Sequence, residues 1–83
     1  MNLARGIRRA REWRQLSARR VSIRMGRDPS LICQYESGRK TPYLSSVKTI
    51  AAAIPGCSLW RILLLSADEG ELLEIQRLLN EII

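Results

Sequence analysis

The sequence predicts an all-helical protein, and three observations support this. Apolar residues recur three and four positions apart along most segments, as on one face of a helix. Glycine, proline and helix-capping residues separate these segments. The 83 residues are 46% hydrophobic yet include only two Trp, two Tyr and no Phe, so aliphatic side chains must fill the interior. This length provides for one compact domain with a modest core.

The first two helices are expected on either side of a short link. Asn2 can cap a helix that runs to about residue 14, which Gly6 should weaken slightly. Ser17 is a good cap for a second, shorter helix over residues 18–25. The inward-facing residues are expected to be Leu3, Ile7 and Ala10 in the first helix and Val21, Ser22 and Met25 in the second.

A turn at Gly26 ends the second helix, because the residue after a helix commonly needs a positive φ. Asp28 and Pro29 follow as a cap and a first helical residue, which predicts a third helix over residues 29–37. Residues 38–42 are then a polar, basic loop that should be exposed.

Three further helices are predicted in the second half. One covers residues 44–53 and ends before Pro55, another covers about residues 58–66, and the last starts at Asp68 or Glu69. The apolar positions of the first of these are Leu44, Val47, Ile50, Ala51 and Ile54. The last helix is amphipathic and must bury an apolar stripe, which consists of Leu72, Ile75, Leu78, Leu79, Ile82 and Ile83.

The net charge of +6 is unevenly placed. Residues 1–43 hold eleven Lys and Arg against three Asp and Glu, whereas residues 44–83 hold three against five. The basic half can face a nucleic acid, an anionic lipid surface or an acidic protein, and charge alone does not choose among them. An ordinary solvated basic surface is the fourth interpretation.

The composition argues against catalysis and against metal or cofactor binding. The chain has no His, and 23 residues separate Cys33 from Cys57, so no metal-ligand cluster or thiol–imidazole pair is expected. We expect both cysteines to be reduced. The apolar segment 59–67 contains Arg61 and is far shorter than the ~20 residues of a membrane span, and residues 1–13 lack a signal-peptide core. A cytoplasmic protein is therefore expected.

Residues at particular spacings in the second and third helices indicate a helix-turn-helix. Ser22 is small where the two helices would cross, Gly26 lies four residues later in the turn, and Ile32 points back into the core. Val21, Met25 and Tyr35 complete the apolar set. In this arrangement the solvent face of the third helix, which is the second helix of the motif, is free to enter a DNA major groove.

These stretches resemble the phage repressor and Cro (XRE-type) helix-turn-helix family. The resemblance lies in LSARRVSIRMGRDPSLICQYESGRKTP, with Gln34 and Tyr35-Glu36-Ser37-Gly38, and in LSSVKTIAAAI after it. It implies a five-helix lambda-repressor-like domain over residues 1–66, with the helix-turn-helix at about 17–37. It also implies a bacterial or phage transcription regulator, working at the nucleoid, that binds palindromic double-stranded operators as a homodimer.

The resemblance also implies roles for individual residues. Base contacts are assigned to Gln34, Ser30, Arg27, Pro29 and Cys33, and phosphate contacts to Ser17, Arg19, Arg20, Arg39 and Lys40. Gln34 is the leading candidate because a glutamine can bond to both N6 and N7 of adenine, although a solvated polar helix face stays open as an alternative. Asp28 brings negative charge toward the DNA, and Ala18 and Pro29 replace frequent polar contacts, so direct readout is expected to be sparse.

Several candidates have structural interpretations. Arg11 and Glu36 match positions that pair in related repressors, so we expect a salt bridge between the first and third helices. Tyr35 is expected in the core, and Trp13 in a partly exposed patch or a partner surface. Cys33 is either a redox-sensitive thiol on the reading helix or a thiol that is buried or inert.

The C-terminal helix, within residues 67–83, leaves two questions open. It either dimerises through its stripe together with Trp60, beside Leu59 and Leu64, or folds back to complete a monomeric core. The chain is either a DNA-binding regulator or a protein-interaction module, such as an antitoxin whose last helix covers a toxin or another regulator.

Overall fold

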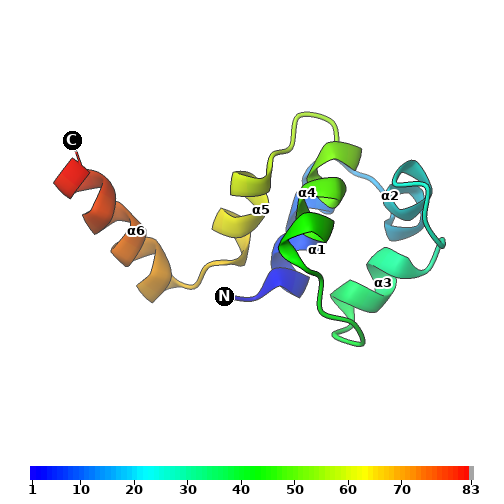
Figure 1. Cartoon of the computed structure of the whole chain (residues 1–83), viewed down its shortest axis with the longest axis horizontal. Coiled ribbons are helices and arrows are strands. Elements are labelled where there is room, and N and C mark those ends of the chain that lie inside the picture. The colour runs from blue at the N-terminus through cyan, green and yellow to red at the C-terminus, as the bar shows by residue number, and fades with distance from the viewer. Residues whose placement is uncertain (83) are drawn as a thin grey trace.

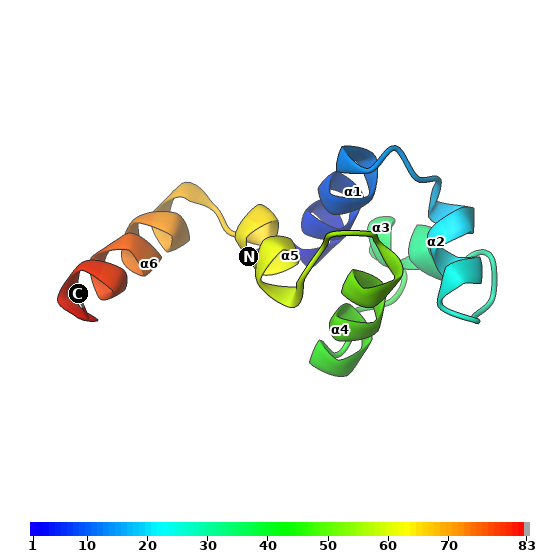
Figure 2. The same ribbon diagram turned by 90° about the horizontal axis from the view of Figure 1, so that it is seen from above.

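The computed structural model describes residues 1–82, which contain six helices and no strand. The helices are α1 (Leu3–Trp13), α2 (Ala18–Arg24), α3 (Leu31–Glu36), α4 (Leu44–Ala53), α5 (Leu59–Ser66) and α6 (Glu69–Ile82). Helices α1 to α5 gather into one body, and α6 projects away from it beyond α5 (Figures 1 and 2). The predicted all-helical fold, with a five-helix domain and an additional C-terminal helix, is confirmed.

The core lies where the first five helices meet, and each helix contributes a fully buried β-branched residue. These residues are Ile7, Val21, Ile32, Ile50 and Ile62, each 0% exposed. The helical periodicity of the sequence therefore identified the inner faces of α1 to α4, whereas no inner face had been assigned to α5. One residue of the predicted set is an exception, since Leu44 is 59% exposed. It occupies the first turn of α4, which extends past the body formed by the other helices (Figure 2).

Helices α1 and α5 pack so closely that Gly6 has no room for a side chain. A Cβ atom there would lie 1.7 Å from Ser66 Oγ and 2.7 Å from the carbonyl oxygen of Ile62. The same crossing is held by Arg5, whose Nη2 donates to the carbonyl oxygens of Ser66 at 3.1 Å and Ala67 at 2.9 Å. Gly6 is therefore a packing requirement, which the sequence expectation of a slightly weakened helix missed.

The turn between α2 and α3 forms as predicted at Gly26, which has a φ of +70°. Helix α3, however, begins at Leu31 and not at Pro29. The carbonyl of Asp28 accepts from the Leu31 N–H at 3.0 Å, and its carboxylate accepts from the Ser30 N–H at 2.8 Å. These bonds make a tight turn over residues 28–31 before the regular helix starts.

Ser22 joins the two helices of this motif by a hydrogen bond that the sequence pattern did not show. Its side chain is fully buried, and its hydroxyl donates to the carbonyl of Ala18 at 2.9 Å. The same oxygen accepts from the N–H of Ile32 at 3.0 Å. Ile32 is in the first turn of α3, where backbone N–H groups have no partner within the helix. Ser22 is thus both small enough for the crossing and a hydrogen-bond partner within it.

Replacing Ser22 by alanine should lower the free energy of unfolding by about 2 kcal/mol, because the buried Ile32 N–H would lose its acceptor. Urea unfolding followed by circular dichroism measures this loss. Ser45→Ala is the matched control on the exposed surface of α4 and should change stability by less than about 0.5 kcal/mol. Equal stability of the two variants would contradict the assigned role of Ser22.

Helix α6 starts with a reciprocal cap. The Asp68 carboxylate accepts from the Glu71 N–H at 2.8 Å, and Glu71 Oε1 accepts from the Asp68 N–H at 3.0 Å. The Glu71 carboxylate also pairs with the Met1 amino group at 2.6 Å. None of the residues described in α6 is buried. In the single chain, α6 therefore does not fold back to complete the core.

Candidate nucleic-acid interface

Helix α3 turns one side to the core and the other to solvent. Leu31, Ile32 and Tyr35 are buried, which accords with the expected core position of Tyr35. On the outer side, a shallow hollow of about 200 Å³ is lined by Ser30, Cys33, Gln34, Ser37 and Arg39. The structure thus brings together three residues that were assigned to base contacts and one assigned to phosphate.

The loop after α3 folds back over the end of that helix. The backbone N–H groups of Arg39 and Lys40 both donate to the carbonyl of Gln34, at 3.0 and 3.2 Å. Gly38 permits this reversal with a φ of +80°. Both basic side chains are exposed, as predicted for the loop, whereas Pro42 at its end is buried, so the prediction of exposure was wrong there. Arg39 lines the hollow on the outer side of α3.

A chain of hydrogen bonds runs along the outer side of α3. Asp28 Oδ1 accepts from the hydroxyl of Ser30 at 2.5 Å as well as from its backbone N–H. The Ser30 oxygen in turn accepts from Gln34 Nε2 at 2.7 Å. These bonds from Ser30 lower the pKa of the Asp28 carboxyl, so it is ionised near neutral pH.

The other DNA-contact candidates lie outside the hollow. Ser17 caps α2 by accepting from the Arg20 N–H at 3.1 Å, and Arg27 and Pro29 are exposed in the turn before α3. Within residues 1–82, no ion pair neutralises any of the basic candidates, which are Arg19, Arg20, Arg27, Arg39 and Lys40. Their charges are available to an external anion.

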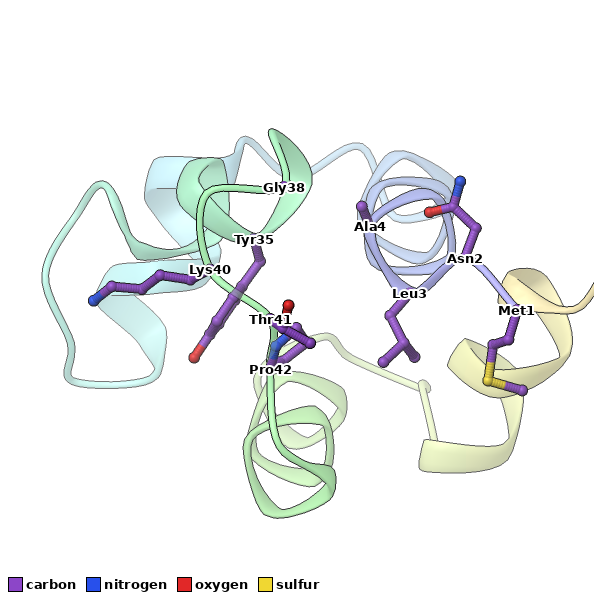
Figure 3. Close-up of a pocket in the computed structure, with 9 residues that line it drawn as sticks. All are labelled: Met1, Asn2, Leu3, Ala4, Tyr35, Gly38, Lys40, Thr41 and Pro42. Atoms are coloured by element: carbon purple, nitrogen blue, oxygen red, sulfur yellow. The ribbon is translucent and has the colours of Figure 1, made fainter.

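A second hollow, of about 430 Å³, lies between the start of α1 and the loop 38–42. Figure 3 shows Leu3, Thr41 and Pro42 toward its middle, while the Lys40 side chain extends away from the start of α1. The residues that line it include no carboxylate, imidazole or thiol.

The expected pair between Arg11 and Glu36 is present and links α1 to α3. Arg11 Nε and Nη2 donate to the two carboxylate oxygens of Glu36 at 2.8 and 2.7 Å, and Nη1 donates to the carbonyl of Leu16 at 2.9 Å. The hydrogen bond to Glu36 raises the pKa of Arg11. This two-bond geometry fixes the orientation of α3 relative to α1.

Two tryptophans lie at the surface away from α3. The guanidinium of Arg61 sits 4.1 Å from the centroid of the Trp13 ring, and Trp13 remains 45% exposed. Trp60 is 71% exposed. Trp13 thus lies in a partly exposed patch, stabilised by a cation–π contact.

The two cysteines are free and differ in environment. Cys33 is exposed on α3, so the alternative of a buried thiol at this position was wrong. Cys57 is half-buried, and burial raises the pKa of its thiol. Among the described residues, no group of three or more His, Cys, Asp and Glu is arranged to hold a metal ion.

An apolar surface continues from α5 onto α6. A groove of about 390 Å³ between the two helices is lined by Met1, Trp60, Leu63, Leu64, Ile75 and Leu79. Further exposed apolar side chains on α6 are Leu72, Leu73, Leu78 and Ile82. Ile83, the last residue of the predicted stripe, lies outside the described residues.

Sequence reasoning missed some residues of both surfaces. Ser37 lines the hollow on α3. It follows Cys33 by four residues and Gln34 by three, and this spacing could have placed it on the same helix face as those two residues. Leu63 and Met1 line the groove, but no sequence pattern places Met1 beside α5 and α6. Asp28 was interpreted only as a cap and a repulsive charge, and its link to Ser30 and Gln34 was missed.

Residues 2–55 match the model of a helix-turn-helix domain family. This match covers more than half of the chain, and the protein therefore belongs to that family. Membership indicates a DNA-binding regulator, in a family whose members are typically not enzymes. No curated protein and no solved structure matches the chain. Within residues 1–82, no helix is long and apolar enough to cross a membrane.

Proposed function

We propose that this protein is a transcription regulator of the phage repressor and Cro type, which binds a palindromic double-stranded operator as a homodimer. The observation that carries the proposal is the two-sided nature of α3. Its inner side is part of the core, and its outer side presents Ser30 and Gln34 beside Arg39, which forms no ion pair with a described residue. A helix with these properties is suited to a major groove.

In this proposal, base edges are read from the start and middle of α3. Gln34 and Ser30 make the principal contacts, and Arg27, Pro29 and Cys33 lie beside them. The backbone phosphates are held by Ser17, Arg19, Arg20, Arg39 and Lys40. Phosphate contacts set the register and most of the salt-dependent affinity, whereas base contacts provide specificity.

Residues 1–66 form the DNA-binding domain of this proposal, and residues 67–83 form the dimerisation element. Support comes from the exposed apolar stripe of α6 and its continuation into the groove with Trp60. A second copy of the chain is the occupant we propose, because a symmetric pair matches two half-sites about 34 Å apart. The dimer would act in the bacterial cytoplasm, at the nucleoid.

A second candidate function is favoured by the same surface. An exposed apolar groove of this kind also suits a different protein, such as a toxin neutralised by its antitoxin. The two functions can coexist in one chain, because α3 lies apart from α5 and α6 (Figure 1), and the groove is lined by residues of α5 and α6 together with Met1. A stable complex with an unrelated protein, formed in place of the homodimer, would favour this candidate.

Selection of binding sites from a random duplex pool at ~150 mM salt tests the DNA-binding proposal. We expect the wild type to enrich a two-fold symmetric motif. Gln34→Ala should remove the preference at one position of each half-site, with a loss of about 1–3 kcal/mol for the preferred base. Gln76→Ala, an exposed substitution of the same kind on α6, should leave the motif unchanged. Enrichment of no motif by the wild type would refute the proposal.

A further inference from the structure

The hydrogen-bond chain from Asp28 to Gln34 has only one chemically allowed direction. An ionised carboxylate can only accept, so the hydroxyl proton of Ser30 must be donated to Asp28 Oδ1. The Ser30 oxygen then offers Gln34 nothing but lone pairs. The group of Gln34 that faces it must be the donor, Nε2. A flipped amide would place Gln34 Oε1 against those lone pairs, which is repulsive.

The fixed amide leaves a defined set of groups for an external partner. One N–H of Gln34 is bonded to Ser30, so one N–H donor and the Oε1 acceptor remain. Gln34 also lines the hollow on the outer side of α3, where a base edge would enter. A neighbouring donor and acceptor match adenine, which presents an N6 donor and an N7 acceptor in the major groove. Guanine presents two acceptors there, O6 and N7.

We propose that Asp28 and Ser30 are positioning residues that lock the Gln34 amide in one orientation and thereby make α3 select adenine over guanine. This inference rests on the proposed function, because it names the base that the same surface reads. Asp28 and Ser30 act through Gln34 and need not touch the base themselves. The negative charge of Asp28, which the sequence suggested would only repel DNA, therefore contributes to base specificity.

The two positioning residues should respond differently to substitution. Asp28→Asn removes a negative charge near the phosphates, so binding to all duplexes strengthens. Asparagine can donate as well as accept, so it no longer forces the direction of the chain, and discrimination between adenine and guanine weakens. Ser30→Ala removes the bridge and frees the amide to flip. Ser30→Thr keeps a hydroxyl and should retain the discrimination.

Binding to paired duplexes provides the first test. The position read by Gln34 is identified as the one whose preference is lost in Gln34→Ala. Dissociation constants are then measured for the selected operator and for its adenine-to-guanine variant at that position. We expect Ser30→Ala and Asp28→Asn to reduce the adenine preference about tenfold, while Asp28→Asn also binds both duplexes more tightly. Glu12→Gln, which changes the net charge equally on α1, should leave the preference unchanged.

Nuclear magnetic resonance of the DNA-free protein provides the second test, which does not depend on a DNA target. One of the two Gln34 side-chain amide protons should show the shift of a hydrogen-bonded proton in the wild type and in Ser30→Thr, but not in Ser30→Ala. An unchanged amide signal in Ser30→Ala overturns the lock itself. An unchanged adenine preference in Ser30→Ala and Asp28→Asn overturns its role in specificity. If the wild type selects no sequence, the proposed function fails and the adenine assignment fails with it.

Discussion

Replacing Gly6 by alanine is expected to destabilise the protein by about 3 kcal/mol. The new Cβ would overlap Ser66 Oγ at 1.7 Å and would lie 2.7 Å from the Ile62 carbonyl oxygen. The carbonyl belongs to the backbone of α5, so rotating the Ser66 side chain cannot relieve the contact. Helix α5 would have to move away from α1, which would break the bonds from Arg5 to the end of α5. This loss exceeds the gain of about 1 kcal/mol that alanine gives over glycine in a helix.

Gly70→Ala on α6 is the matched control for this substitution. Its Cβ would meet Asp68 Oδ1 at 3.4 Å, an ordinary contact. Because alanine also has a better helix propensity than glycine, Gly70→Ala should not lower the stability of the protein. Thermal unfolding of both variants at equal concentration measures the difference. A Gly6→Ala variant as stable as the wild type would show that α1 and α5 do not pack as closely as described.

Local signals in the sequence were enough to predict most of the fold. Asn2 and Ser17 were predicted as helix caps, and both accept a backbone N–H at the start of the helix that they predict. Helix α4 has the predicted bounds, because an apolar repeat is ended by the Pro55 segment. Caps and breakers act within a few residues of chain, so their effects can be recognised without knowledge of the tertiary structure.

Features that depend on contacts between distant segments could not be predicted in this way. The closeness of α1 and α5 at Gly6 depends on Ser66, which is 60 positions away in the sequence. The later start of α3 reflects the competition of the Asp28 turn with a regular first helical turn. For Leu44, periodicity identified a face of the helix but not how far along α4 the core extends.

The candidate site was predicted in part. The outward direction of Gln34 and Ser30 follows from the helical period together with the buried positions of Ile32 and Tyr35. The orientation of the Gln34 amide does not follow from the period, because it depends on a chain of side-chain hydrogen bonds through Ser30 to Asp28. Which bases these groups contact stays a prediction for the selection experiment.

The exposure of α6 provides a physical argument for a partner. The helix has 14 residues and no buried residue in the single chain. Helices of this length are marginal in water without tertiary contacts. Its cap and the pair between Glu71 and the Met1 amino group stabilise only its first turn. The remaining turns need an apolar surface, and the groove with Trp60 and Leu64 is adjacent to them.

Replacing Leu79 by glutamate is therefore expected to separate the proposed dimer. Leu79 lines the groove between α5 and α6 and is 53% exposed, so the change should leave the fold of the single chain intact while placing a charge in the dimer surface. Two linked domains can gain a factor of about 100 or more in affinity over one domain. Operator affinity should fall by about that factor.

Asn80→Glu, which adds the same charge at the neighbouring exposed residue outside the stripe, is the control. Analytical ultracentrifugation at micromolar concentration should find dimers for the wild type and Asn80→Glu, and monomers for Leu79→Glu. Fluorescence anisotropy with full and half operators should show the affinity loss only on the full site, because a single domain contacts one half-site in either case. A wild type that stays monomeric, both free and on the operator, would refute the dimer and leave the groove to a different protein.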